Sequence, residues 1–315
     1  MKLFHETEIN CFSDQNLKIC IISDIHFSYR VKTARLRALQ KRLKIVRPDY
    51  IFIPGDIVDS NDMIKNPAEE TRLLSFLKSL GEIAPTIISK GNHDIFHKPS
   101  KLEQKNLKSR WRVQDNPSFR SKVNELKNVS YLDDAAFEDE KIYAFCLTAS
   151  PETYCLSRRE PRRDSKTGED PESLLLDLEK HAKTFKNLPS TKKKFILIHT
   201  PASLADEKIR QKLSGFDFII SGHMHNGLVF PLLFELWPSD RGIISASKKL
   251  FTKLTRTTEK TLDQKLIING AVTTWHESVG ILHLLNVFYP SYFTTIKFSK
   301  HNSKTPKIKH RYLKF

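Results

Sequence analysis

The sequence predicts an α/β fold with parallel strand pairs, because short apolar runs alternate along the chain with helical patterns. The runs are rich in Ile and Phe and have the length of buried strands; they are Ile19–Ile22, Tyr50–Ile53, Thr86–Ile88, Phe195–Ile198 and Phe216–Ile220. Apolar residues recur every three or four positions, as on a helix with one buried face, in Arg30–Val46, Glu69–Leu80 and Glu172–Phe185. Such strand–helix–strand units pair their strands in parallel through right-handed crossovers.

The pattern changes near the end of the chain. Three further runs follow one another with no helical pattern between them, and they predict successive strands at Lys265–Asn269, Ile281–Phe288 and Tyr292–Phe298.

A polar motif closely follows each of the five early strands. The motifs are Asp24–His26, Gly55–Asp59, Gly91–Asp94, the single residue His199, and Gly222–His225. Open α/β sheets place their sites at the carboxyl ends of strands, so these motifs are expected to meet. Carboxylate, amide and imidazole groups are hard or borderline metal ligands, and the set predicts a metal site.

The five motifs, taken in order, resemble the calcineurin-like metallophosphoesterases, whose pattern is D-x-H, G-D-x-x-D, G-N-H-D/E, H and G-H-x-H. Every part of that pattern is present, and the resemblance spans about residues 17–285, with a looser match over 96–190. The resemblance implies a four-layer α/β/β/α sandwich, in which two mixed sheets are flanked by helices. It also implies that the late strands lie in the second sheet.

The resemblance further implies a dinuclear metal-dependent hydrolase of phosphoester bonds. Two divalent ions about 3.5–4 Å apart can hold a bridging hydroxide that attacks phosphorus in line. The family places a bridging Asp between the ions, which here is Asp56. The implied ligands of the first ion are Asp24, His26 and His225, and those of the second ion are Asn92, His199 and His223. The set has no thiolate, which suits Mn, Fe, Zn or Ni, and we favour Mn.

His93 lies beside a ligand but is not one in the family pattern, so it is the candidate general acid for the leaving oxygen. Asp59 is expected to fix the orientation of His93, although an Asp here could also serve as a turn or capping residue. Asp94 is a weaker candidate for the same work. The glycine before a motif ligand, as in Gly55, Gly91 and Gly222, is expected where the chain must approach the ions closely.

A single domain covering residues 1–315 is expected, because candidate ligands from Asp24 to His225 must meet in one core. Within it we expect a basic helical insertion at about 98–190 and a basic C-terminal tail at 299–315. The four Cys residues have no metal-type spacing and are few, which indicates a reducing compartment. Since the first 18 residues lack the apolar core of a signal peptide, we expect a cytoplasmic protein.

The net charge is +16 at pH 7. Basic residues gather in Lys101–Lys127, Arg158–Arg163, Lys192–Lys194 and Lys297–Phe315. Fields of this sign attract nucleic acid, anionic lipid and other polyanions, although a solvated basic surface from Lys-rich composition is an equal alternative. The apolar segment Gly227–Pro238 is either a buried connector or a rim for a lipid-linked phosphate at the inner face of a membrane.

Three functions therefore stay open, and the oligomeric state is not predicted. The favoured one is a metallophosphoesterase acting on a small or lipid-linked phosphate ester, because no ligand is degenerate. A nuclease or nucleotide phosphodiesterase of the same fold is less favoured, since the basic runs carry few stacking aromatics beyond Trp111. The third is a non-catalytic interaction module.

Overall fold

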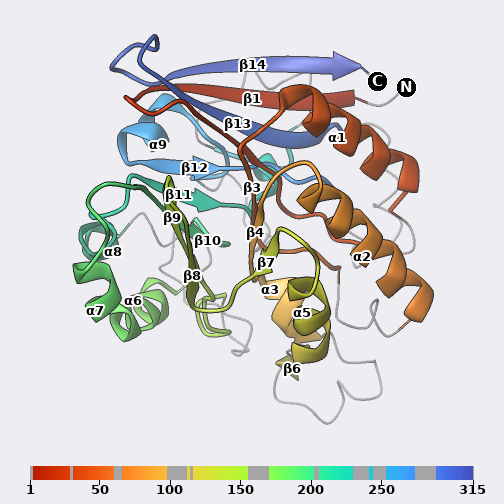
Figure 1. The fold of residues 1–315 in the computed structure, drawn as a ribbon. Helices are drawn as coiled ribbons and strands as arrows, with labels where there is room; N and C mark the ends of the chain where they lie inside the picture. The colour runs from red at the N-terminus through yellow and green to blue at the C-terminus, as the bar shows by residue number, and fades with distance from the viewer. Residues whose placement is uncertain are drawn as a thin grey trace.

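The computed structural model describes residues 3–28, 31–59, 66–97, 112–113, 116–154, 170–201, 206–229, 241–243, 253–273 and 289–314. Two mixed sheets lie face to face in the middle of the molecule (Figure 1). The seven-stranded sheet has the order β14-β1-β13-β2-β3-β4-β7, and the five-stranded sheet has the order β12-β11-β10-β9-β8. A small third sheet pairs β5 with β6.

The strands have the following bounds. In the larger sheet they are β1 (Leu3–Phe12), β2 (Leu17–Ile21), β3 (Tyr50–Pro54), β4 (Thr86–Ser89), β7 (Val129–Tyr131), β13 (Ser291–Ser299) and β14 (Lys307–Lys314). In the smaller sheet they are β8 (Ala135–Glu138), β9 (Ile142–Leu147), β10 (Lys193–Ile198), β11 (Phe218–Ser221) and β12 (Leu266–Ile268). The outer pair is β5 (Phe96–His97) and β6 (Arg112–Val113).

Helices cover the outer face of each sheet (Figure 1). On the side of the larger sheet lie α1 (Thr33–Val46), α2 (Pro67–Gly81) and α5 (Pro117–Asn124), and on the side of the smaller sheet lie α6 (Pro171–Lys180), α7 (Ala182–Lys186) and α8 (Glu207–Lys212). The short helices are α3 (Asn92–Ile95), α9 (Glu259–Asp263) and the 3-10 turn η3 (His225–Leu228). The predicted fold class, two mixed sheets flanked by helices, is confirmed.

β3 illustrates how one strand serves two cores. Tyr50 and Phe52 point between the sheets, where Phe52 meets Phe195 of β10 with ring centroids 5.2 Å apart. Ile51 and Ile53 point the other way and pack against the helix side of the sheet. A strand buried on both faces reads as a continuous apolar run, which is why such runs were the sequence signal.

Two strands had no such signal. β14 is the edge strand of the larger sheet and pairs with β1. Both segments carry charged residues, and neither was predicted as a strand. The acidic side chains of β1 have cationic partners: Arg42 of α1 contacts Glu6 at 2.6 Å, and Lys297 of β13 and Arg311 of β14 contact Glu8 at 2.5 and 3.3 Å. The basic segment expected as a tail therefore contains an edge strand, Lys307–Lys314.

One other expectation about the topology is wrong, and a second is incomplete. The strand predicted at Tyr292–Phe298 belongs to the larger sheet, between β1 and β2, whereas the strand predicted at Lys265–Asn269 joins the smaller one as β12. The stretch expected as a helical insertion contains α5, α6 and α7, and it also contributes β7, β8 and β9 to the two sheets. Strand order depends on pairing between distant segments, which local periodicity does not record.

Part of the prediction falls outside the described residues, namely Ile281–Phe288 and most of Gly227–Pro238. Within the described residues, no helix has the length and apolar character needed to cross a membrane. Cys11, Cys20 and Cys146 are buried free thiols.

Candidate metal centre

The five motifs meet where the carboxyl ends of strands from both sheets converge. β2, β3 and β4 run parallel in one sheet, and β10 and β11 run parallel in the other. Their loops are joined through the backbone, since Asp24 donates its N–H to Gly55 at 3.2 Å and Gly222 donates to His199 at 3.0 Å. All expected site residues are buried: Asp24, His26, Asp56, Asp59, Asn92, His93, His199, His223 and His225.

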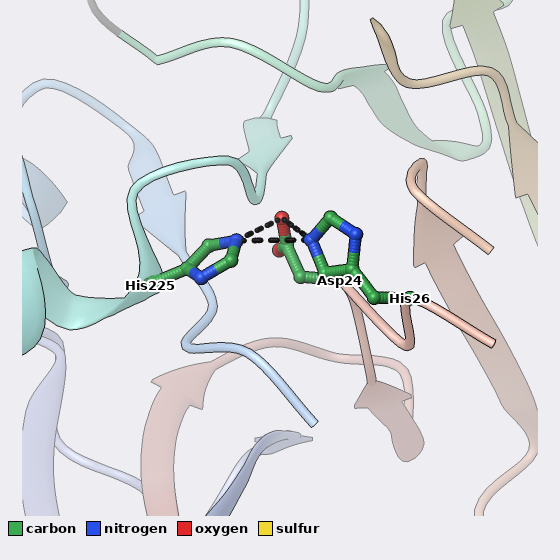
Figure 2. Close-up of side chains that lie close together, drawn as sticks. All are labelled: Asp24, His26 and His225. Carbon is green, nitrogen blue, oxygen red and sulfur yellow. Dashed lines mark hydrogen bonds and ion pairs between the residues drawn. The ribbon is translucent and has the colours of Figure 1, made fainter. Parts of the chain in front are cut away.

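One group of side chains is formed by Asp24, His26 and His225, which point toward one another in Figure 2. Nε2 of His225 lies 3.2 Å from Asp24 Oδ1 and 3.1 Å from Nε2 of His26. Nε2 of His26 lies 3.9 Å from the same Asp24 oxygen. Three ligand atoms so close together can reach a single cation.

A second group is formed by Asp56, His199 and His223. Oδ2 of Asp56 lies 3.1 Å from Nε2 of His199 and 3.6 Å from Nε2 of His26. One carboxylate oxygen thus stands between a histidine of each group. Nδ1 of His199 donates to the carbonyl oxygen of Pro54 at 2.7 Å, which directs Nε2 toward Asp56.

The residues present fit a pair of divalent cations. Within the described part of the chain, Oδ1 of Asn92 is buried and accepts no hydrogen bond. A buried acceptor of this kind is costly unless another group satisfies it. A bound cation would satisfy it, and the oxygen and imidazole donors of the site suit Mn, Fe, Zn or Ni.

The electrostatics keep both carboxylates anionic. Burial alone would raise the pKa of Asp24, but the hydrogen bond and charge of His225 outweigh it and the pKa is lowered. Burial acts in the same direction on Asp56, yet the charges of His199 and His93 hold its pKa well below the ordinary value. Burial lowers the pKa of His199, but Asp56 outweighs it and raises that pKa to about 10. Deprotonated carboxylates are what metal binding requires.

The backbone of the motifs is held in an uncommon conformation. Asp24, His26, Asp56, His223 and His225 all have positive φ, between 44° and 68°. Non-glycine residues rarely adopt this conformation, which costs about 1–3 kcal/mol each and gathers at functional sites. The strands end and the chain turns at once, which aims the side chains inward.

The motif glycines allow backbone and ligand to touch. A Cβ added to Gly222 would lie 2.6 Å from Oδ2 of Asp24, and one added to Gly55 would lie 2.7 Å from Nδ1 of His199. Real Cβ atoms do not approach other atoms so closely. The expectation that side chains at these positions would block the approach is in accord with these distances.

His93 is oriented by Asp59 in a way the sequence did not suggest. Nδ1 of His93 lies 2.6 Å from the backbone carbonyl oxygen of Asp59, while the Asp59 carboxylate is 3.9 Å away. A carbonyl oxygen only accepts, so Nδ1 carries the proton. That carboxylate also lies 3.7 Å from Nδ1 of His26, between two histidines of the site.

Asp94 ties two motif loops together. Its carboxylate accepts from the backbone N–H groups of Gly91, Ile57 and Val58, at 2.8, 2.9 and 3.2 Å. Burial and, next, the charge of Asp56 raise the pKa of Asp94 to about 7. Asp94 thus positions the loop that carries Asn92 and His93.

Tyr154 is a residue that motif reasoning missed. It is buried, and its ring centroid lies 5.4 Å from that of His223 and 6.2 Å from that of His199. The apolar run Ile142–Leu147 before it resembles the other site strands, and this was the available signal.

Comparison with known proteins agrees with the motif pattern. The family model of the calcineurin-like phosphoesterases matches residues 17–227, which is more than half of the chain. An uncharacterised metallophosphoesterase of Campylobacter jejuni is 23% identical over 220 residues, which cover 70% of this chain and 47% of that protein. The chain thus spans about half the length of this curated relative.

Solved structures are similar at low identity. A dimetal phosphatase of Danio rerio is 12% identical, with a TM-score of 0.44, and the match covers 93% of this chain and 98% of that one. The phosphopantetheinyl hydrolase of Mycobacterium tuberculosis is 11% identical, with a TM-score of 0.37, and the match covers 66% of this chain and 83% of that one.

Proposed function

Since the chain belongs to the calcineurin-like phosphoesterase family, whose members depend on two metal ions, we propose that it hydrolyses phosphate esters at the centre described above. In this proposal Asp24, His26 and His225 hold one ion, and Asn92, His199 and His223 hold the other. Asp56 serves both.

The position of Asp56 carries the proposal. Its Oδ2 stands between Nε2 of His199 and Nε2 of His26, at 3.1 and 3.6 Å. Its other oxygen, Oδ1, accepts from the backbone N–H of His93 at 2.8 Å, which fixes the carboxylate plane. A carboxylate held in this way can offer both ions a ligand.

When bound, the two ions supply a water-derived nucleophile and neutralise charge on the phosphoryl oxygens. The protein contributes the proton. Because Nδ1 of His93 donates to the carbonyl of Asp59, the second proton of its imidazolium form would be carried by Nε2, which can give that proton to the leaving oxygen and leave His93 neutral. The proposal thus assigns general acid catalysis to His93 and its orientation to Asp59.

The finer assignments rest on composition. Mn is favoured because the ligands are oxygen and imidazole groups without thiolate. A small or lipid-linked phosphate ester is the preferred substrate class, and a nucleic acid is the weaker alternative suggested by the charge of +16. A cytoplasmic location is part of the same proposal.

Metal analysis of the purified protein after incubation with Mn tests the centre. Two ions per chain and chelator-sensitive hydrolysis of an aryl phosphate are expected. Asp56→Asn should lower the occupancy of both ions, because it removes the shared charge, whereas Asp14→Asn at an exposed carboxylate should leave both in place. Wild-type protein that binds no metal would overturn the proposal.

The substrate class is tested with the same protein. Mono-aryl and bis-aryl phosphates, nucleotides, DNA and phospholipids should be compared at equal metal loading. Turnover of DNA well above that of the small esters and phospholipids would favour the nuclease. No turnover of any substrate by protein that holds two ions would favour the non-catalytic alternative.

A further inference from the structure

Tyr154 completes a group of three rings with His199 and His223. The His199 and His223 centroids are 5.0 Å apart, and the Tyr154 ring meets His223 nearly edge to face, with an interplanar angle of 64°. Its centroid is also 6.2 Å from His199. Tyr154 thus contacts both imidazoles proposed to hold the second ion.

The topology of the smaller sheet places Tyr154 there. β9 runs parallel to β10, and β10 runs parallel to β11. The carboxyl ends of the three strands therefore lie at one edge of the sheet, where β10 leads to His199, β11 leads to His223, and β9 leads through a short turn to Tyr154. β9 lies outside the five motif strands, yet it contributes to the same site.

A buried carboxylate of α6 holds the turn that carries Tyr154. Oδ2 of Asp177 accepts from the backbone N–H of Ser150 at 2.8 Å and from the hydroxyl of Thr153 at 3.4 Å. The backbone N–H of Asp170, at the start of α6, donates to the carbonyl oxygen of Thr153 at 2.9 Å. Asp177 and Thr153 are both buried. The turn is thus fixed, at Ser150 and at Thr153, to the helix α6 and its first residues.

We propose that Tyr154 is a positioning residue for His199 and His223, and that α6 sets its place through Asp177. The inference rests on the proposed function, because it assigns those histidines to the second ion. An imidazole binds metal well only when its ring is held in the correct plane. The carbonyl of Pro54 holds His199 through a hydrogen bond, and the Tyr154 ring packs against both histidines.

The prediction concerns one ion and not the other. Loss of a group that orients a ligand typically weakens metal binding 10–100-fold. Tyr154→Leu should lower the affinity for the second ion by about this factor and leave the affinity for the first ion unchanged. Tyr154→Phe keeps the ring and should bind both ions as wild type does. Asp177→Asn, which keeps an acceptor oxygen but loses the charge, should lower the affinity for the second ion by a smaller factor.

Two variants that each keep one site allow the affinity for each ion to be measured separately, by titrating Mn in competition with a chromophoric chelator. His199→Ala leaves the first site, and there Tyr154→Leu should change nothing. His26→Ala leaves the second site, and there Tyr154→Leu should lower the affinity about 10–100-fold. Far-ultraviolet circular dichroism confirms folding of each variant, and Asp177→Asn provides the test if Tyr154→Leu does not fold.

Several results would overturn the inference. One is that Tyr154→Leu leaves the Mn affinity of the His26→Ala variant unchanged. Another is that Tyr154→Leu lowers the Mn affinity equally in the His26→Ala and His199→Ala variants. Tyr154→Phe as weak as Tyr154→Leu would assign the effect to the hydroxyl instead of the ring. Wild-type protein without metal would refute the proposed function itself, so the two failures are distinguishable.

Discussion

Gly91→Ala is expected to abolish the metal centre by displacing one carboxylate. An added Cβ would overlap both Oδ1 and the backbone nitrogen of Asp56 and lie 2.9 Å from its carboxyl carbon, whereas ordinary contact begins at 3.4 Å. The carboxylate must therefore move by at least about 0.5 Å relative to residue 91. Metal–ligand distances tolerate changes of only about 0.2 Å. Because the proposed centre shares Asp56 between the ions, both should bind weakly.

The cost to folding should be moderate in comparison. Overpacking costs about 1–3 kcal/mol of the free energy of unfolding, and the overlap with the Asp56 backbone places Gly91→Ala at the upper end of that range, so the metal-free variant should fold with reduced stability. Gly215→Ala is the matched control, since its Cβ would meet mainly the end of the Leu188 side chain, at 2.9 Å, far from the motifs. Elemental analysis after Mn incubation and urea unfolding without metal measure the two effects. A Gly91→Ala protein with two ions and wild-type turnover would refute the reasoning.

Three further predictions test other parts of the molecule. His93→Ala should keep both ions but lower kcat about 10²–10⁴-fold. The loss should be smaller for an activated aryl leaving group, which needs little protonation. Equal losses on good and poor leaving groups would argue against general acid catalysis. Burial, together with the charges of His310 and Arg256, lowers the pKa of His5 to about 3, so the stability that its neutral form contributes is complete above pH 6.5 and is lost as the pH falls toward 3. Between pH 7 and 5, metal-free wild type should therefore lose about 2 kcal/mol more than His5→Phe in urea unfolding, and equal losses would contradict the shift. Replacing the exposed Lys304, Lys307 and Lys309 with Gln should weaken binding to anionic vesicles at low salt. The same replacement of Lys183, Lys186 and Lys208 on α7 and α8 is the control and should not weaken it. If wild-type protein shows no preference for anionic over neutral vesicles, the membrane proposal is refuted.

The sequence alone was sufficient for the five motif strands and for the convergence of the motifs. Runs such as Tyr50–Ile53 are apolar on both faces because helices cover one side of each sheet and the opposite sheet covers the other. Parallel strands then bring their carboxyl ends together at one edge. The order of the motifs carried the family resemblance, because each ligand type is required by the chemistry and not by packing.

Only the tertiary structure decided which charged segments form strands and what surrounds the ligands. β1 pairs with β13 and β14, which lie at the other end of the sequence, and its Glu6 and Glu8 find partners in Arg42, Lys297 and Arg311. The carbonyl oxygen of Asp59, and not its carboxylate, accepts the hydrogen bond from Nδ1 of His93, and no residue type encodes a backbone contact. Tyr154 reaches the site because β9 pairs with β10, and pairing between distant strands is a property of the whole fold.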